Sequence, residues 1–144
     1  MIEQDTIRLL RECDAGARMG ISSIQDVTDY VSDGELKRLL QECKREHDVL
    51  TDEINGELNR FGDEGKKPDA MAKGMSWLKT NVKLAVNESD ETVADLITDG
   101  CNMGVKSLNK YLNKYKAADE HSKDITKRLI NLEERLAIDI RAYL

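Results

Sequence analysis

The sequence predicts an all-α protein, a four-helix bundle with one extra helix in a long crossover, formed by residues 1–144 as a single domain. Charged residues make up 35% of the 144 residues, and there is only one Pro and one Phe, a composition that favours helices over sheets. Apolar residues recur at alternating spacings of three and four, as on a bundle helix. A chain of this length can also bury a sufficient core without a metal or a disulfide.

The first two helices are predicted to form a hairpin over residues 5–61. The inward positions of the first, about 5–31, are Leu10, Cys13, Ala17, Gly20, Ile24, Val27 and Val31. Ser32 is predicted to cap the second helix, with Glu35 as its reciprocal partner. The inward positions of that helix, about 33–61, are Leu36, Leu40, Cys43, His47, Leu50, Ile54, Leu58 and Phe61. His47 is therefore expected to point into the core.

A different pattern separates this hairpin from the next. Gly62 and Gly65 break the helix, and Pro68 suits the first turn of a new one. A narrower apolar stripe follows over residues 68–86, formed by Met71, Met75, Leu78, Val82 and Ala85. We expect the only tryptophan, Trp77, to dock this crossover helix on the bundle.

The second hairpin is predicted over residues 90–144, with a cap at Asn87, Ser89 or Asp90. Its first helix, about 90–116, has the inward positions Ala94, Ile97, Cys101, Val105, Leu108, Leu112 and Tyr115. Its second helix begins near Asp119 and continues through Ile125, Leu129, Leu132, Leu136, Ile140 and Tyr143. A crossover helix of ~28 Å would return the chain along the bundle, so the helices at 33–61 and 90–116 should run parallel, in an up-down-down-up arrangement.

An internal repeat links the two hairpins. The segments 16–25 and 100–109 align without a gap and share both glycines, a methionine and a serine. Pairing the second helices at an offset of 86 residues matches His47 with Glu133. The glycines of the two segments are predicted to mark a close crossing of the first helix on the third bundle helix. These glycines are Gly16, Gly20, Gly100 and Gly104.

Three segments are similar to segments of uncharacterised bacterial proteins of the ferritin-like superfamily. They are residues 33–37, 75–83 and 99–104, with the sequences DGELK, MSWLKTNVK and DGCNMG. The duplicated hairpin and the crossover likewise resemble a ferritin-like four-helix bundle. The resemblance implies the fold, and because the function of that family is itself unassigned, it implies no particular activity.

A di-iron bundle of this type needs a Glu from each of two helices and a Glu-x-x-His from each of the other two. Neither histidine is part of a Glu-x-x-His motif, because the residue three positions before His47 is Lys44 and the one three positions before His121 is Ala118. A degenerate site could be formed by His47 and Glu133, whereas the simpler interpretation of His47 is a core histidine bonded to a neighbouring helix. We expect no di-iron centre, and the sequence assigns no catalytic, cofactor-binding or metal-binding residue.

The three cysteines, Cys13, Cys43 and Cys101, are an odd number at wide spacings. They are interpreted as buried apolar residues rather than as a disulfide framework. A zinc cluster of Cys43, Cys101 and His47 can be drawn, but it lacks the close cysteine pair of structural zinc sites. Activation of Cys43 by His47 would need an opening for substrate, which a buried seam does not provide.

Charge and hydropathy restrict the function further. The formal net charge of −6 argues against a nucleic-acid partner. The absence of a secretory signal or a long apolar run predicts a cytoplasmic protein without a membrane span. The sequence favours a non-catalytic bundle that acts through protein contacts, as a homodimer or with an unidentified protein partner and without a cofactor. The alternative is a degenerate or metal-dependent ferritin-like oxidoreductase, similar to rubrerythrin.

Overall fold

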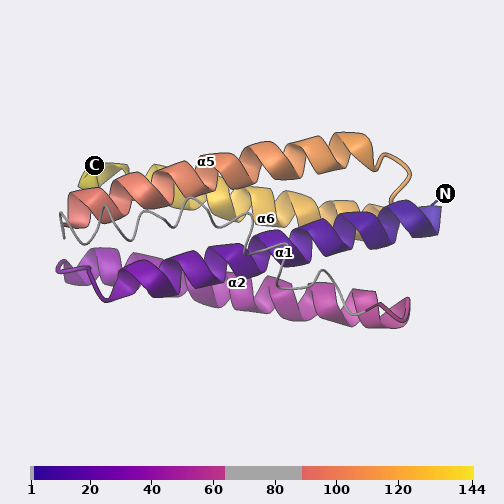
Figure 1. Cartoon of the computed structure of the whole chain (residues 1–144), viewed down its shortest axis with the longest axis horizontal. Coiled ribbons are helices and arrows are strands. Elements are labelled where there is room, and N and C mark those ends of the chain that lie inside the picture. The colour runs from indigo at the N-terminus through magenta and orange to yellow at the C-terminus, as the bar shows by residue number, and fades with distance from the viewer. Residues whose placement is uncertain (1, 64–88) are drawn as a thin grey trace.

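The computed structural model describes residues 2–63 and 89–144. Four long helices lie side by side (Figure 1), and no strand occurs among these residues. The elements are α1 (Ile2–Thr28), α2 (Gly34–Arg60), α5 (Asp90–Lys114), α6 (Glu120–Asp139) and the 3-10 helix η2 (Ile140–Tyr143). The predicted all-α four-helix bundle is confirmed. The predicted crossover helix at 68–86, with Trp77, lies outside the described residues.

The bundle consists of two hairpins. α1 packs mainly on α2, and α5 packs mainly on α6, while α1 also contacts both α5 and α6. The backbone N–H groups of Ser32 and Asp33 donate to the Asp90 carboxylate at 2.8 and 3.0 Å. The N-termini of α2 and α5 therefore lie together, and these two helices run in the same direction (Figure 1).

The opposite end of the bundle is joined by the N-terminus of α1. The carboxylate of Asp5 accepts from the backbone N–H of Ala117 at 3.1 Å, and the hydroxyl of Thr6 accepts from that of Asp119 at 2.8 Å. These bonds fix the turn between α5 and α6 against the first hairpin. Polar contacts thus hold the two hairpins together at both ends, and the apolar core lies between.

Side-chain caps set the helix starts. Asp33, and not Ser32 as predicted, caps α2, because its carboxylate accepts from the N–H groups of Glu35 and Leu36 at 2.8 and 2.9 Å. A carboxylate at this position also interacts favourably with the helix dipole. Ser89 caps α5, as one of the three predicted alternatives, and Asp119 caps α6.

The core follows the predicted helical seams. The fully buried large side chains include Leu10, Leu36, Leu40, Ile54, Leu58, Ile125, Leu129 and Ile140. One acidic residue outside the predicted inward positions is also buried: Asp14 is 1% exposed. Its Oδ1 pairs with Arg18 at 3.0 Å, while its Oδ2 has no hydrogen-bond partner in the described structure.

Candidate functional site

A cavity of about 260 Å³ lies between α1 and α5. Its deep wall is formed by His47 of α2 and Glu133 of α6. All four glycines of the repeated segments line it, and its apolar lining includes Met19, Ile24, Ile97, Leu108 and Leu136. The cavity therefore connects the surface between two helices with the middle layer of the bundle.

The glycines do not mark the predicted close crossing of α1 on α5. A Cβ atom added at Gly16 would meet only a methyl group of Leu108, at 4.0 Å. One added at Gly104 would first meet the Glu133 carboxyl group, at 3.5 Å. At Gly16, Gly20 and Gly104 the missing side chains leave room for a cavity and for buried polar groups, and the nearest atoms are those of side chains.

Position 20 requires a glycine because the side chain of His47 packs against it. A Cβ atom at this position would lie 2.8 Å from Nε2 and 2.9 Å from Cδ2 of His47, and 3.5 Å from Oε1 of Glu133. The first two distances are shorter than van der Waals contact allows. Gly20 therefore provides the space that the imidazole ring occupies.

The ring of His47 is held at both nitrogens. Its Nδ1 lies 2.8 Å from the backbone carbonyl oxygen of Cys43, and because a carbonyl only accepts, Nδ1 carries a hydrogen. Its Nε2 lies 3.2 Å from Oε1 of Glu133. His47 is 1% exposed and Glu133 is 7% exposed. The structure thus brings together the two residues that the sequence matched across the repeat, and His47 is bonded to a neighbouring helix as the simpler interpretation predicted.

The surroundings of His47 favour its charged form. Burial lowers the pKa of His47, but the hydrogen bonds to Cys43 and Glu133, together with the charge of Glu133, outweigh this effect and raise the pKa to about 10. At neutral pH an imidazolium therefore donates to the Glu133 carboxylate. The pair has no net charge, which is the form in which two ionised groups are tolerated inside a protein.

The three cysteines are buried free thiols, as predicted. Burial raises the pKa of Cys13 to about 12. Burial, and then the charge of Glu133, raises the pKa of the Cys101 thiol, which lines the cavity. The Sγ atom of Cys43 lies 3.6 Å from Nδ1 of His47, farther away than the carbonyl oxygen. Buried thiols that stay protonated are poor nucleophiles.

No metal centre is assembled by the described residues. Within residues 2–63 and 89–144, no group of three or more His, Cys, Asp or Glu side chains is placed to hold a metal ion. The zinc cluster drawn from Cys43, Cys101 and His47 is accordingly not formed. His47 and Glu133 remain a pair of possible ligands from two helices.

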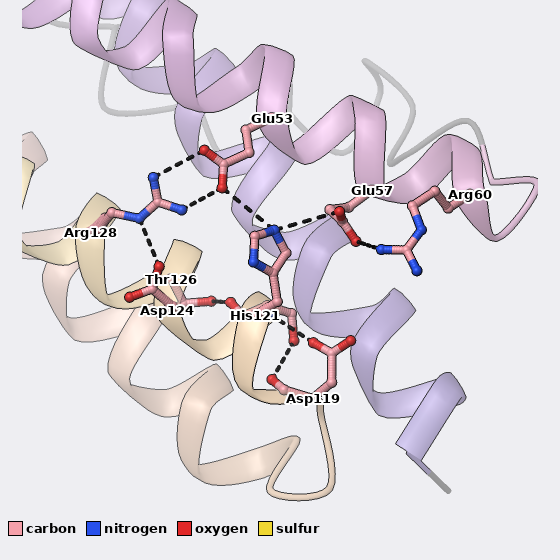
Figure 2. Close-up of polar contacts among 9 residues, drawn as sticks. Glu53, Glu57, Arg60, Asp119, His121, Asp124, Thr126 and Arg128 are labelled. Atoms are coloured by element: carbon pink, nitrogen blue, oxygen red, sulfur yellow. Dashed lines mark hydrogen bonds and ion pairs between the residues drawn. The ribbon is translucent and has the colours of Figure 1, made fainter.

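The second histidine belongs to a surface network. His121 of α6 lies between Glu53 and Glu57 of α2, with its Nε2 3.5 Å from an oxygen of each (Figure 2). Arg128 also pairs with Glu53, and Arg60 pairs with Glu57 at 2.8 Å. His121 is half exposed and does not line the cavity. Exposed ion pairs of this kind add little to stability, so we interpret the network as a contact between α2 and α6.

Comparisons with protein-family models, with curated proteins and with solved structures found no match to this chain. The assignment to a family therefore stays a prediction from the sequence. Among the described helices, none combines the length and the apolar character that crossing a membrane requires. The site has to be interpreted from its own geometry.

The sequence did not predict the cavity. The repeated glycines were the available signal, but small residues at helical spacing are compatible with either a close helix crossing or an open space between helices. Glu133 was not among the predicted inward positions, which include its neighbour Leu132, and it is buried. Its proximity to His47 follows from the bundle, which places α2 next to α6.

Proposed function

We propose that this protein is a non-catalytic helical bundle that binds a small, mostly apolar molecule in the cavity between α1 and α5. The observation that carries the proposal is that glycines of both helices open a cavity onto a buried His47–Glu133 pair. Binding sites for small molecules are typically concave and mostly apolar, with a few polar groups that orient the ligand. Bundle cores commonly hold such sites between facing helices.

The volume limits the size of the ligand. An engineered apolar cavity of about 150 Å³ is large enough for benzene. In proportion, the cavity of about 260 Å³ accommodates a molecule of about ten non-hydrogen atoms. A bicyclic aromatic ring is of this size, whereas a nucleotide or a folded peptide is too large.

The chemistry of the lining favours binding over catalysis. Both ring nitrogens of His47 are engaged, one with a backbone carbonyl and the other with Glu133. The imidazole therefore has no free lone pair with which to accept a proton from a substrate. The Cys101 thiol at the cavity wall is kept protonated by burial. His47 is therefore not available as a base, and Cys101 is not an activated nucleophile.

The sequence adds two further parts to the proposal. The bundle belongs to the ferritin-like group, a placement supported by the parallel course of α2 and α5. It also acts in the cytoplasm through protein contacts, as a homodimer or an adaptor, and ligand binding then regulates or accompanies that contact. Cross-linking and sedimentation of the purified protein test this part, and a monomer without partners at micromolar concentration contradicts it.

A degenerate metal-dependent oxidoreductase is the second candidate. It is favoured by one observation, the meeting of His47 and Glu133 from two helices in the middle layer of the bundle. Iron or manganese in near-stoichiometric amounts after anaerobic purification, lost on Glu133→Gln, would support this candidate. The cavity proposal predicts instead a protein without bound metal.

Binding of the apolar bicycle indene tests the cavity directly. Indene should shift the backbone amide resonances of Gly20 and Gly104 in a saturable titration. Gly16→Leu should abolish the shifts, because a Cβ at this position meets nothing closer than 4.0 Å and the longer side chain extends into the cavity. Gly56→Leu is the matched control, since nothing lies within 4 Å of its Cβ and it does not line the cavity. Indene shifts that persist in Gly16→Leu, or that are absent from the wild type, contradict the proposal.

A further inference from the structure

The geometry points to a specific class of ligand: an uncharged apolar ring system that carries one hydrogen-bond donor, which it gives to Glu133. This inference rests on the proposed function, because it concerns the same cavity. Three features of the deep wall support it: the exposure of the carboxylate to the cavity, the lack of a free donor beside it, and the charge balance of the pair.

The Glu133 carboxylate is left uncovered by the two glycines around it. Gly20 and Gly104 lie against it, and added Cβ atoms there would be 3.5 Å from its Oε1 and Cδ, respectively. The side chain of Glu133 is 10% exposed and lines the cavity. A larger residue at either position would contact the carboxyl group and reduce the space around it. The two glycines therefore keep an acceptor accessible to a bound molecule.

The polar groups of this wall accept hydrogen bonds more readily than they donate them. An ionised carboxylate accepts up to about four hydrogen bonds and donates none. His47 supplies one of them to Glu133, and its other N–H is used by the Cys43 carbonyl. Burial, and then the charge of Glu133, raises the pKa of the Cys101 thiol, so this thiol is at most a weak donor. The Glu133 carboxylate can therefore accept a further hydrogen bond from a ligand. A ligand group that only accepts hydrogen bonds would find no free strong donor on this wall.

The charge balance excludes ionised ligands. Imidazolium and carboxylate already neutralise each other, and the remaining lining is mostly apolar. A carboxylate on the ligand would face Glu133, and an ammonium would meet a carboxylate that is already paired with His47. The other carboxylate of the lining, Glu12, interacts with Tyr111. Burying either charge without compensation is costly. A hydroxyl or a ring N–H provides the donor without the charge.

Indole and indene provide a matched test, because they share shape and size and differ by the replacement of a CH₂ group with N–H. Both should bind the full-length wild-type protein in calorimetric titrations, and indole should bind roughly tenfold more tightly, as expected for one hydrogen bond to a charged acceptor. Indole-2-carboxylate should bind at least tenfold more weakly than indole. Equal affinity for indole and indene, or tight binding of indole-2-carboxylate, would overturn the inference.

A double variant identifies the acceptor. Replacing both members of a hydrogen-bonded pair with apolar groups of similar shape is tolerated better than removing one, so His47→Leu combined with Glu133→Met should fold. In this variant indene should still bind, and the preference for indole should disappear. A preference that persists means that another group accepts the N–H, which rejects the assignment to Glu133. Failure of the wild type to bind either probe rejects the proposed function itself, and binding of both with equal affinity rejects only the ligand class.

Discussion

Gly16 and Gly20 occupy neighbouring turns of α1, yet their surroundings predict opposite effects of the same substitution. At Gly16 the nearest atom to an added Cβ is 4.0 Å away, whereas at Gly20 the ring of His47 is 2.8 Å away. That ring cannot move aside easily, because both of its nitrogens are hydrogen-bonded.

We therefore expect Gly16→Ala to raise the free energy of unfolding by about 0.5–1 kcal/mol, since alanine favours a helix over glycine by about that amount. Gly20→Ala should lower it by roughly 1–3 kcal/mol, as overpacking does. Urea denaturation measures both, with Gly56→Ala as a control for helix propensity alone. Equal effects at positions 16 and 20 would contradict the packing described for His47.

His47 and Glu133 should be strongly coupled in stability. Removing one member of a buried charged pair leaves the other without a partner, so His47→Leu or Glu133→Met alone should cost about 2–4 kcal/mol. The double variant should recover most of this loss. A double-mutant cycle by chemical denaturation measures the coupling, and additive single effects would show that the two residues do not interact in solution.

The raised pKa of His47 predicts a pH dependence of stability. The folded state binds the proton more tightly than the unfolded state, whose pKa is near the ordinary 6.5. The stabilisation is therefore complete below this value and is lost as the pH rises through the folded pKa of about 10. The free energy of unfolding should fall between about pH 7 and about pH 8, below the range in which cysteine and tyrosine titrate. The double variant, which lacks the pair, should lose this slope.

At the level of single elements, the start of α2 depends on a capping residue that the sequence pattern misplaced by one position. Ser32 and Asp33 are both capping residues by type, and only the backbone path decides which one reaches the free N–H groups. In the structure Asp33 accepts two of them. Asp33→Ala should lower the free energy of unfolding by about 1 kcal/mol. Ser32→Ala should change it by less than about half of that, and thermal unfolding distinguishes the two outcomes.

The seams of the helices were predictable because periodic apolar residues have only one way to be buried in a bundle. Leu36, Ile54 and Leu129 are 0% exposed, as their spacing requires. Asp14 was not predictable in this way, since it pairs with an exposed arginine one turn away while its own side chain is buried. The open space beside Gly16 was missed because it depends on which side chains of the other helices extend toward it.

The crossover helix predicted at residues 68–86 lies outside the described residues and stays a prediction. Trp77 is expected to be buried against the bundle, because a single helix of this length is marginal in water unless it packs on other elements. The fluorescence maximum of the native protein should lie at shorter wavelength than that of the protein in urea. An emission typical of a fully exposed tryptophan, unchanged by unfolding, would contradict this expectation.

For the whole molecule, the arrangement of the helices could be predicted from the sequence, whereas the cavity could not. The 28 residues, 62–89, between the second predicted helix and the one that begins at Asp90 predicted a return along the bundle. The Asp90 contacts place the N-termini of α2 and α5 together. The sequence named His47 and Glu133 only as a conceivable degenerate site, and the structure brings the two side chains together. The volume above them depends on packing between α1 and α5, which no local pattern specifies.

A crystal structure of the protein soaked with indole tests the central claim most directly. The account predicts density for one indole molecule between α1 and α5, beside Gly16 and Gly100, with its ring nitrogen within hydrogen-bonding distance of Glu133. The His47–Glu133 contact should remain in place beneath it. A cavity filled by side chains of the protein, such as Trp77, with indole absent or bound only at the surface, would contradict the account.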